Sequence, residues 1–520
     1  MRLRHTGPAV AALTGLLTLA ACGGGQAPGA GSAARGQAGA AKGVLRFATF
    51  TVPDTFDPTK RSAGTSGLNY LFPVYDPLLR TDPTGKVVAG LATAWKLSAG
   101  DLTLTLRPGL KFSDGETLDA AAVKANLERC KAAGGGCGST LAHVTGVEAP
   151  DATTVVIKTD GPQPALLFGL TTGAGMMVSP KAFDSPDLGR APVGAGAYVL
   201  DAAATVPGST WVYTKNKHYW DPAQQTLDRL EIVLIGTAQQ RVAALRTGQV
   251  DASMIGDAQE LASYREAGLQ TAVTEGGDPI GVITVDPSGP FADQRVRQAV
   301  GYALDRAALT GTPFRKGMST PSDQLFSPGN AGHADAPAFA YTHDPAKARA
   351  LLAEAGVKDV PVTIPAMPGP QNKTEAEAVA GMLNAVGFKA KVVSPPPQMI
   401  GREIYSGKYH LAYVPVFVPD APTLADALAP EGGAMNPTGR PYTKALDLAR
   451  QAAAASVADE AKGRALYAEM MAALTEEGVV IPAFWSPVGV AYAGHVKGLR
   501  PWAGGYMGPP VYGVSVGEKG

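Results

Sequence analysis

The feature that most constrains the fold is a repeated alternation of short apolar strands with amphipathic helices. The segment DLTLTLRPGLKF (101–112) carries leucine at every second position of its first half, which predicts a strand with one buried face. Asp119 then stands where it can cap a helix that places Val123, Leu127 and Cys130 on one face. Further strands are predicted at 153–159, 209–216, 227–235 and 479–485, further helices from 237 to 248 and at 293–309, 344–356 and 459–478, and a helix, a glycine stop and a strand within 376–393. This alternation predicts an α/β fold with more than one lobe.

The beginning of the chain resembles a secretion signal. Basic residues open it, and the apolar run Ala9 to Ala21 that follows is shorter than the roughly 20 residues that cross a bilayer. The sequence LAAC (19–22) is similar to the bacterial lipobox, in which the cysteine is lipidated and becomes the new N-terminus. We therefore expect residues 1–21 to be a signal peptide and Cys22 to be a lipid anchor. The alternative is an ordinary signal peptide that happens to end near a cysteine.

The stretch after Cys22 is almost entirely glycine, alanine, serine, proline and glutamine. Such a segment has too few apolar side chains to offset its ordering entropy. Residues 22–43 are therefore predicted to be a flexible linker, which would hold a folded body at the outer face of the cytoplasmic membrane.

Charge and motifs exclude several classes of function. The chain has 45 Lys and Arg against 45 Asp and Glu, so there is no basic field for a nucleic acid. The sequence contains no H-E-x-x-H or Walker motif, and we expect neither an enzyme nor a bound cofactor.

Two cysteines remain beyond Cys22. Cys130 and Cys137 are separated by a glycine-rich stretch, and an oxidising compartment favours a disulfide between them. A metal pair is the rival interpretation, but no histidine or further cysteine lies close in sequence to complete it.

Seven segments in order along the chain resemble the family-5 extracellular solute-binding proteins, the dipeptide and oligopeptide class that serves ABC importers. They are LATAWKLSAGDLTLTLRPGLKFSDGETLDAAAVKANLER (91–129), PVGAGAYVL (192–200), KNKHYWD (215–221), LRTGQVDA (245–252), DQRVRQAVGYALDR (293–306), DPAKARALLAEAG (344–356) and LTEEGVVIPAFW (474–485). Most residues of these segments are expected to have structural roles rather than to contact a ligand. Within them, Arg297 is expected to form a surface pair.

The resemblance implies an architecture. It is the two-lobed type II periplasmic-binding-protein fold, cluster C-like, with the ligand enclosed at a cleft and a hinge of paired crossover strands. The crossovers would lie near GVITVD (281–286) and IPAFWSP (481–487). Lobe I would comprise 44–280 and 490–520 with an extra subdomain at about 81–187, and lobe II would comprise 281–489. The closed form would be recognised by permease subunits that work with cytoplasmic ATPases, and we expect a monomer.

The same resemblance implies how a ligand is held. Dipeptide binders of the family use an aspartate for the amine and an arginine for the carboxylate, because a buried charge needs a partner. Here Val418 stands where the aspartate belongs, with Asp420 two residues away, and Gln371 stands where the arginine belongs. If both placements hold, the chain does not grip a short peptide by its two ends. It would bind longer peptides by their backbones, or a different solute.

Weaker candidates lie elsewhere. Gly64 and Thr65 match a ligand-contacting turn of the dipeptide binders, although they could form a surface turn without contact. Trp485, beside the proposed hinge, could form the floor of the pocket or belong to the core. Three tyrosines are lesser candidates: Tyr70, Tyr405 and Tyr413.

Together these features predict a membrane-anchored, extracytoplasmic solute-binding lipoprotein that delivers a peptide-like solute, in the simplest case an oligopeptide, to an ABC permease. The alternatives are a nickel or metallophore chelate, an oligosaccharide, or a purely structural or signalling lipoprotein. The seven histidines are scattered and form no ligand set in the sequence, and aromatic residues make up only 7% of the chain.

Overall fold

A computed structural model describes residues 43–61, 67–274, 276–367, 369–396, 399–404, 406–416, 418, 420–429, 433, 435–436, 439–440, 442–501 and 512–518. Three sets of predicted features therefore lie outside the described residues: the signal peptide with Cys22 and nearly all of the linker, the Gly64–Thr65 turn, and Tyr405. No helix in the described part of the chain is long and apolar enough to span a membrane.

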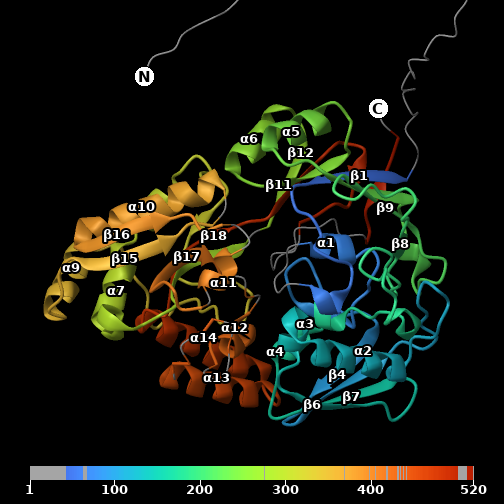
Figure 1. Ribbon diagram of the computed structural model, residues 1–520, viewed down its shortest axis with the longest axis horizontal. Helices are drawn as coiled ribbons and strands as arrows, with labels where there is room; N and C mark the ends of the chain where they lie inside the picture. Colours follow the sequence, from blue (N-terminus) through green and yellow to red (C-terminus); the bar gives the residue numbers. More distant parts are fainter. Residues whose placement is uncertain are drawn as a thin grey trace, which may run out of the picture. The chain divides into compact units, whose positions relative to one another are not determined.

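The first lobe is built on a mixed seven-stranded sheet of order β12-β19-β11-β1-β10-β9-β8 (Figure 1). Its central strand β1 runs parallel to β10 and β11, and the other neighbours are antiparallel. Fully buried side chains such as Phe47 and Ile232 form its core. The strands are β1 (Val44–Thr49), β8 (Tyr198–Leu200), β9 (Thr210–Lys215), β10 (Arg229–Leu234), β11 (Ala252–Ile255), β12 (Gln270–Val273) and β19 (Gly489–Tyr492), accompanied by α1 (Leu68–Leu71), α5 (Ala238–Arg246), α6 (Ala258–Glu266) and the small pair β20 (Val496–Lys497) and β21 (Ser515–Val516).

An antiparallel four-stranded sheet of order β4-β5-β7-β6 forms a separate layer with its own apolar core. Leu102, Leu104 and Leu106 are buried as their alternation predicts, and Asp119 caps α2 by accepting a hydrogen bond from the Ala122 N–H at 3.0 Å. The elements are β2 (Leu79–Thr81), β3 (Val87–Ala89), β4 (Ala92–Leu97), β5 (Asp101–Leu106), β6 (Val144–Glu148), β7 (Thr154–Thr159), α2 (Ala120–Ala133), α3 (Gly135–Thr140) and α4 (Ala165–Gly169).

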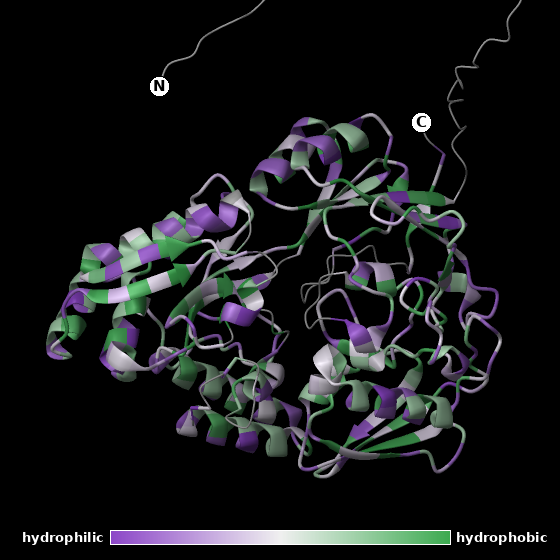
Figure 2. Ribbon diagram, in the orientation of Figure 1, coloured by the Kyte–Doolittle hydropathy of each residue, from purple (hydrophilic) through white to green (hydrophobic). Residues whose placement is uncertain are grey.

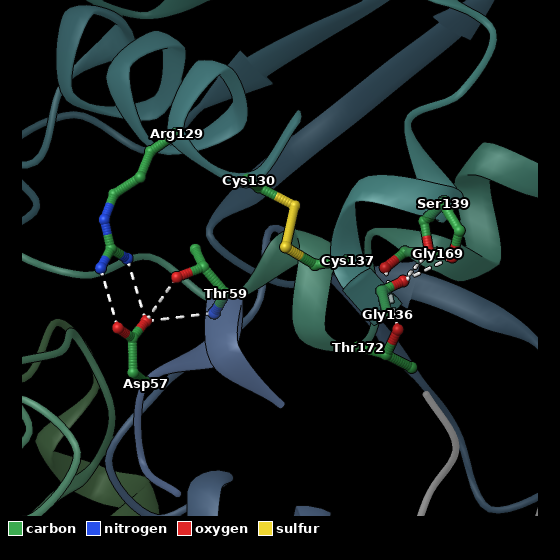
Figure 3. The surroundings of a disulfide bond; sticks show 10 residues. Asp57, Thr59, Arg129, Cys130, Gly136, Cys137, Ser139, Gly169 and Thr172 are labelled. Atoms are coloured by element: carbon green, nitrogen blue, oxygen red, sulfur yellow. Dashed lines mark hydrogen bonds and ion pairs between the residues drawn. A yellow bond between two sulfur atoms is a disulfide. The ribbon is translucent and has the colours of Figure 1, made fainter. Parts of the chain in front are cut away.

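Cys130 of α2 and Cys137 of α3 are joined by a disulfide, with their Cα atoms 5.7 Å apart (Figure 3). Beside them, Arg129 donates two hydrogen bonds to the carboxylate of Asp57, at 3.0 and 2.9 Å. Asp57 lies in the first lobe's N-terminal segment and is 1% exposed. The disulfide therefore lies next to a partly buried ion pair that connects α2 to the start of the folded body.

The second lobe has an antiparallel four-stranded sheet of order β14-β18-β13-β17 and a parallel pair, β15 and β16. Hydrophilic and hydrophobic residues lie side by side along its helices, as expected of helices with one buried face (Figure 2). The strands are β13 (Asp278–Thr284), β14 (Thr320–Pro321), β15 (Val360–Pro365), β16 (Phe388–Val393), β17 (Leu411–Pro415) and β18 (Val480–Ser486), and the helices are α7 (Gln294–Ala303), α8 (Arg306–Thr310), α9 (Pro345–Glu354), α10 (Pro370–Val386), α11 (Ile400–Ile404), α12 (Ala421–Ala427), α13 (Thr443–Ser456) and α14 (Glu460–Glu476).

Two sequence predictions need correction in this lobe. The single helix predicted at 293–309 is two helices, because Leu304 is extended with ψ 117° and Asp305 caps a new helix by accepting from the Ala308 N–H at 2.9 Å. Arg297 is not at the surface. It is 5% exposed and donates to the backbone carbonyls of residues 291, 292 and 477.

The chain passes between the two main sheets at two places that lie side by side. The Thr274 N–H donates to the carbonyl of Val488 at 3.0 Å, and the Val488 N–H donates to Thr274 Oγ1 at 3.2 Å. Beyond this point β13 pairs with β18, starting at Asp278 opposite Ser486. Gly277 packs so closely here that a Cβ would overlap the Ser486 carbonyl, so the approach of the two crossovers requires glycine. Paired crossovers therefore connect the two lobes.

Candidate functional site

A buried ion pair lies at the crossover end of the second lobe's sheet. Arg315, from the segment after α8, donates to Glu375 of α10 through Nε at 2.7 Å and through Nη2 at 3.2 Å. The Arg315 side chain is 8% exposed and that of Glu375 is 1% exposed. This two-point contact satisfies both carboxylate oxygens and compensates both charges.

Further contacts tie the ion pair to the strands. The Tyr413 hydroxyl of β17 donates to Glu375 Oε2 at 3.0 Å, and Arg315 Nη1 donates to Ser486 Oγ of β18 at 2.6 Å. The guanidinium also lies over the ring of Phe484, 4.9 Å from its centroid. Tyr413, a lesser candidate in the sequence, thus holds Glu375 in place, and burial raises its pKa well above the ordinary value.

Gln371, the residue predicted to replace a carboxylate-binding arginine, reaches this ion pair from the first turn of α10. With its amide oxygen turned toward Arg315, it accepts from Nη2 at 2.6 Å and from Nε at 3.0 Å. That orientation satisfies the amide better than the reverse one, in which its nitrogen faces Glu375 at 3.3 Å. A guanidinium is therefore present beside Gln371, but its charge is already balanced by Glu375.

Asp278 occupies the crossover itself, as the first residue of β13. It is partly buried, and burial raises the pKa of its carboxyl group to about 6. Among the described residues, none forms a hydrogen bond or an ion pair with this carboxylate. The carboxylate of Glu375, in contrast, accepts hydrogen bonds from three groups: Arg315 Nε, Arg315 Nη2 and the Tyr413 hydroxyl.

Trp485 lies next to Ser486 in β18 and is partly buried. Its indole N–H lies 3.1 Å from the Gln324 carbonyl oxygen and 3.0 Å from that of Leu325. His333 meets the indole edge to face at 6.2 Å between ring centroids. Because successive strand residues point to opposite faces, Trp485 faces away from the side on which Ser486 meets Arg315.

The two candidates for amine binding lie elsewhere in the second lobe. Val418 is 8% exposed and packs in the apolar cluster beneath α12 and α14. Asp420 caps α12 by accepting from the Thr423 N–H at 2.9 Å, and burial raises the pKa of its carboxyl group. Tyr70 is fully buried in the first lobe, where its hydroxyl donates to the Thr51 carbonyl at 2.7 Å.

Sequence reasoning missed Arg315, Glu375 and Asp278. Arg315 and Glu375 come from segments 60 positions apart that show no shared local pattern, so no spacing rule could pair them. Asp278 lies just before the stretch identified as the first crossover. In the part of the chain that the structure describes, no group of three or more His, Cys, Asp or Glu side chains is arranged to hold a metal ion.

Comparison with known proteins assigns this chain to a family. Residues 86–434 match the family described as bacterial extracellular solute-binding proteins, family 5 Middle. The glutathione-binding protein GsiB of Salmonella paratyphi A is 31% identical over 323 residues, and the match covers 60% of this chain and 60% of that protein.

Solved structures share the fold over nearly the whole chain. The periplasmic binding protein AgaA from A. tumefaciens R10, in complex with agropinic acid, is 26% identical with a TM-score of 0.79, covering 92% of this chain and 99% of that one. DppA from Helicobacter pylori, in complex with the peptide STSA, is 21% identical with a TM-score of 0.78, covering 92% and 98%. The relatives are solute-binding proteins rather than enzymes, in agreement with the expectation from the sequence. The chain therefore belongs to family 5 of the bacterial extracellular solute-binding proteins, and it has their two-lobed type II α/β fold.

Proposed function

We propose that this protein is the extracytoplasmic solute-binding component of an ABC importer and that it captures a peptide-like solute, in the simplest case an oligopeptide. The observation that carries the proposal is the pair of adjacent crossovers. The chain passes from the first sheet to the second between β12 and β13 and returns between β18 and β19. Two short neighbouring connections let two rigid lobes rotate about one line and enclose a solute, and the closed form would then be presented to the permease.

The charges in the second lobe favour a solute that is not held as a short zwitterion. Gln371 carries no charge, and the guanidinium beside it is neutralised by Glu375. Asp420 uses its carboxylate to cap a helix. A longer peptide, whose backbone supplies many neutral hydrogen-bonding groups, fits this pattern better than a dipeptide. GsiB and DppA are described as binding glutathione and a peptide, which supports the peptide class.

A non-peptide solute is the second candidate, and AgaA gives it specific support. AgaA is described in complex with agropinic acid and shows the highest identity to this chain among the structures compared above. Nickel chelates and oligosaccharides remain rival ligands within this candidate.

The membrane anchor is part of the proposal and rests on the LAAC sequence (19–22). Replacement of Cys22 by serine is expected to move the protein from the membrane fraction to the soluble fraction. The comparison is made by fractionating cells that produce either form. Unchanged membrane retention would refute the anchor while leaving solute capture in place.

The first test of capture is native mass spectrometry of the protein starting after Cys22, purified gently so that a retained solute survives. A spread of adducts with peptide masses supports the oligopeptide proposal and gives the range of lengths. A single non-peptide mass supports the second candidate. If no adduct is retained, a thermal-shift screen with peptides, nickel chelates and oligosaccharides follows, and a screen without any stabilising compound would refute solute capture.

A further inference from the structure

We propose that Asp278 binds a cationic group of the captured solute, either a protonated amine or a guanidinium. The inference rests on the proposed function and deepens it, because it names the chemical class that the crossover region selects. Its starting point is the position of Asp278 at the junction of the two lobes, in the first pair of the β13–β18 ladder.

The register of the ladder places Asp278 beside the polar cluster of the second lobe. Asp278 lies directly opposite Ser486, and directly paired residues of antiparallel strands project from the same face of a sheet. Ser486 Oγ is on the face that contacts Arg315. Asp278, Ser486 and the ion pair therefore share one face, next to the predicted ligand-binding residue Gln371.

On this face the positive charge of Arg315 is already paired, whereas the carboxylate of Asp278 is, among the described residues, free to pair with a solute. Arg315 is fully engaged, with Glu375, Ser486 and the Gln371 amide around its guanidinium. Asp278 has no such partner among the described residues, although it is partly buried. A carboxylate in that position is costly to ionise unless a cation arrives, and its raised pKa shows that cost. An anionic solute group, in contrast, would find no free cation in this cluster.

A structural role for Asp278 is the competing explanation, and it predicts different behaviour. A carboxyl group that merely packs at the crossover would be replaced by the isosteric amide without any effect on solute discrimination. A carboxylate that pairs with the solute loses its charge in that replacement, and a charge-assisted hydrogen bond disappears with it.

The test uses calorimetric titration of wild-type protein, Asp278→Asn and the control Asp184→Asn. Asp184 is exposed in the first lobe and forms no described ion pair, so its replacement matches the change of net charge. The probes are pairs that differ only in one positive charge: tetra-alanine and its N-acetylated form, N-acetyl-Ala-Lys-Ala-Ala and its Nζ-acetylated form, and putrescine and its diacetylated form.

We expect at least one cationic probe to bind the wild type more tightly than its acetylated partner. Asp278→Asn should weaken that probe by roughly tenfold to a hundredfold and remove most of the discrimination, whereas Asp184→Asn should bind like the wild type. Melting curves of all three proteins check that the variants are folded.

Three outcomes overturn the inference: unchanged binding of the cationic probe by Asp278→Asn, equal binding of the acetylated partner by the wild type, or no binding of any cationic probe. They are distinguishable from failure of the proposed function. Binding of a neutral or anionic solute that Asp278→Asn leaves unaltered preserves solute capture and removes only the role of Asp278.

Discussion

Removal of the charge of Glu375 is the sharpest stability test that the structure offers. Glu375→Gln keeps the shape of the side chain but leaves the guanidinium of Arg315 buried without a counter-charge. Both side chains are less than 10% exposed, and the pair is held by contacts of 2.7 and 3.2 Å. Breaking such a buried pair costs roughly 3 to 5 kcal/mol of unfolding free energy. For a lobe of about 200 residues, that loss lowers the melting temperature by roughly 6 to 20 °C.

A matched control lies on the same helix. Lys373 and Glu377 of α10 form a pair at 3.9 Å in which both side chains are more than half exposed. Exposed pairs of this kind contribute little, so Glu377→Gln should change the unfolding free energy by less than about 0.5 kcal/mol. Scanning calorimetry and urea unfolding of the wild type and both variants provide the comparison.

A second variant separates the buried charge from lost packing. The double replacement Arg315→Met with Glu375→Leu removes both charges, and it should be more stable than Glu375→Gln because no uncompensated ion remains. The unfolding free energy of the double variant should be no more than slightly above that of the wild type, because the Tyr413 hydroxyl and Gln371 lose their partners. A Glu375→Gln variant as stable as Glu377→Gln would refute the reasoning and show that water reaches Arg315.

Three further predictions concern other parts of the chain. Replacement of both Cys130 and Cys137 by alanine should lower the unfolding free energy by about 2 kcal/mol, because the closed loop is short, and mass spectrometry of unreduced fragments should show the two linked. The carboxyl of Asp278 has its pKa raised to about 6, so its protonation contributes stability that is complete below the ordinary value of 3.8 and is lost as the pH rises through about 6. Melting temperatures between pH 4 and 7 should therefore fall less steeply in Asp278→Asn than in the wild type, and parallel curves would contradict this. Burial alone would raise the pKa of Asp57, but the hydrogen bonds from Arg129 and Thr59 outweigh burial and lower that pKa. Asp57→Asn should therefore destabilise the folded protein at neutral pH and have little effect on its stability in acid, where the wild-type carboxylate is protonated. Urea midpoints of both proteins at the two pH values would show this.

Local patterns were sufficient for most of the secondary structure. Alternating leucines marked β5, and capping aspartates such as Asp119 and Asp344 marked helix starts, because these signals act within a few residues. The break between α7 and α8 was missed because the apolar stripe continues through Leu304, which is fully buried. Only the backbone conformation of that residue and the cap at Asp305 reveal the break.

The candidate site was predictable only where the family resemblance supplied positions. Gln371 was singled out as a replaced anchor, and the structure places it against Arg315. The presence of that arginine could not be anticipated, because the contact is made by segments that are distant in the chain and adjacent only in the folded lobe. Asp278 carries no motif either. It becomes conspicuous through its register opposite Ser486 and its lack of a described partner, both of which require the tertiary structure.

The polar cluster of the second lobe links the geometry of the hinge to the recognition of charge. Arg315 holds Ser486, the last residue of β18 before the return crossover, and through Glu375 it also holds α10 and β17. Gln371 contacts the same guanidinium, so a solute that competes for this amide also acts on the group that positions the crossover. Asp278 sits across the ladder from Ser486, on the other crossover. A cation drawn to Asp278 would therefore be bound where the two connections meet, so that its binding energy acts at the hinge of the lobes.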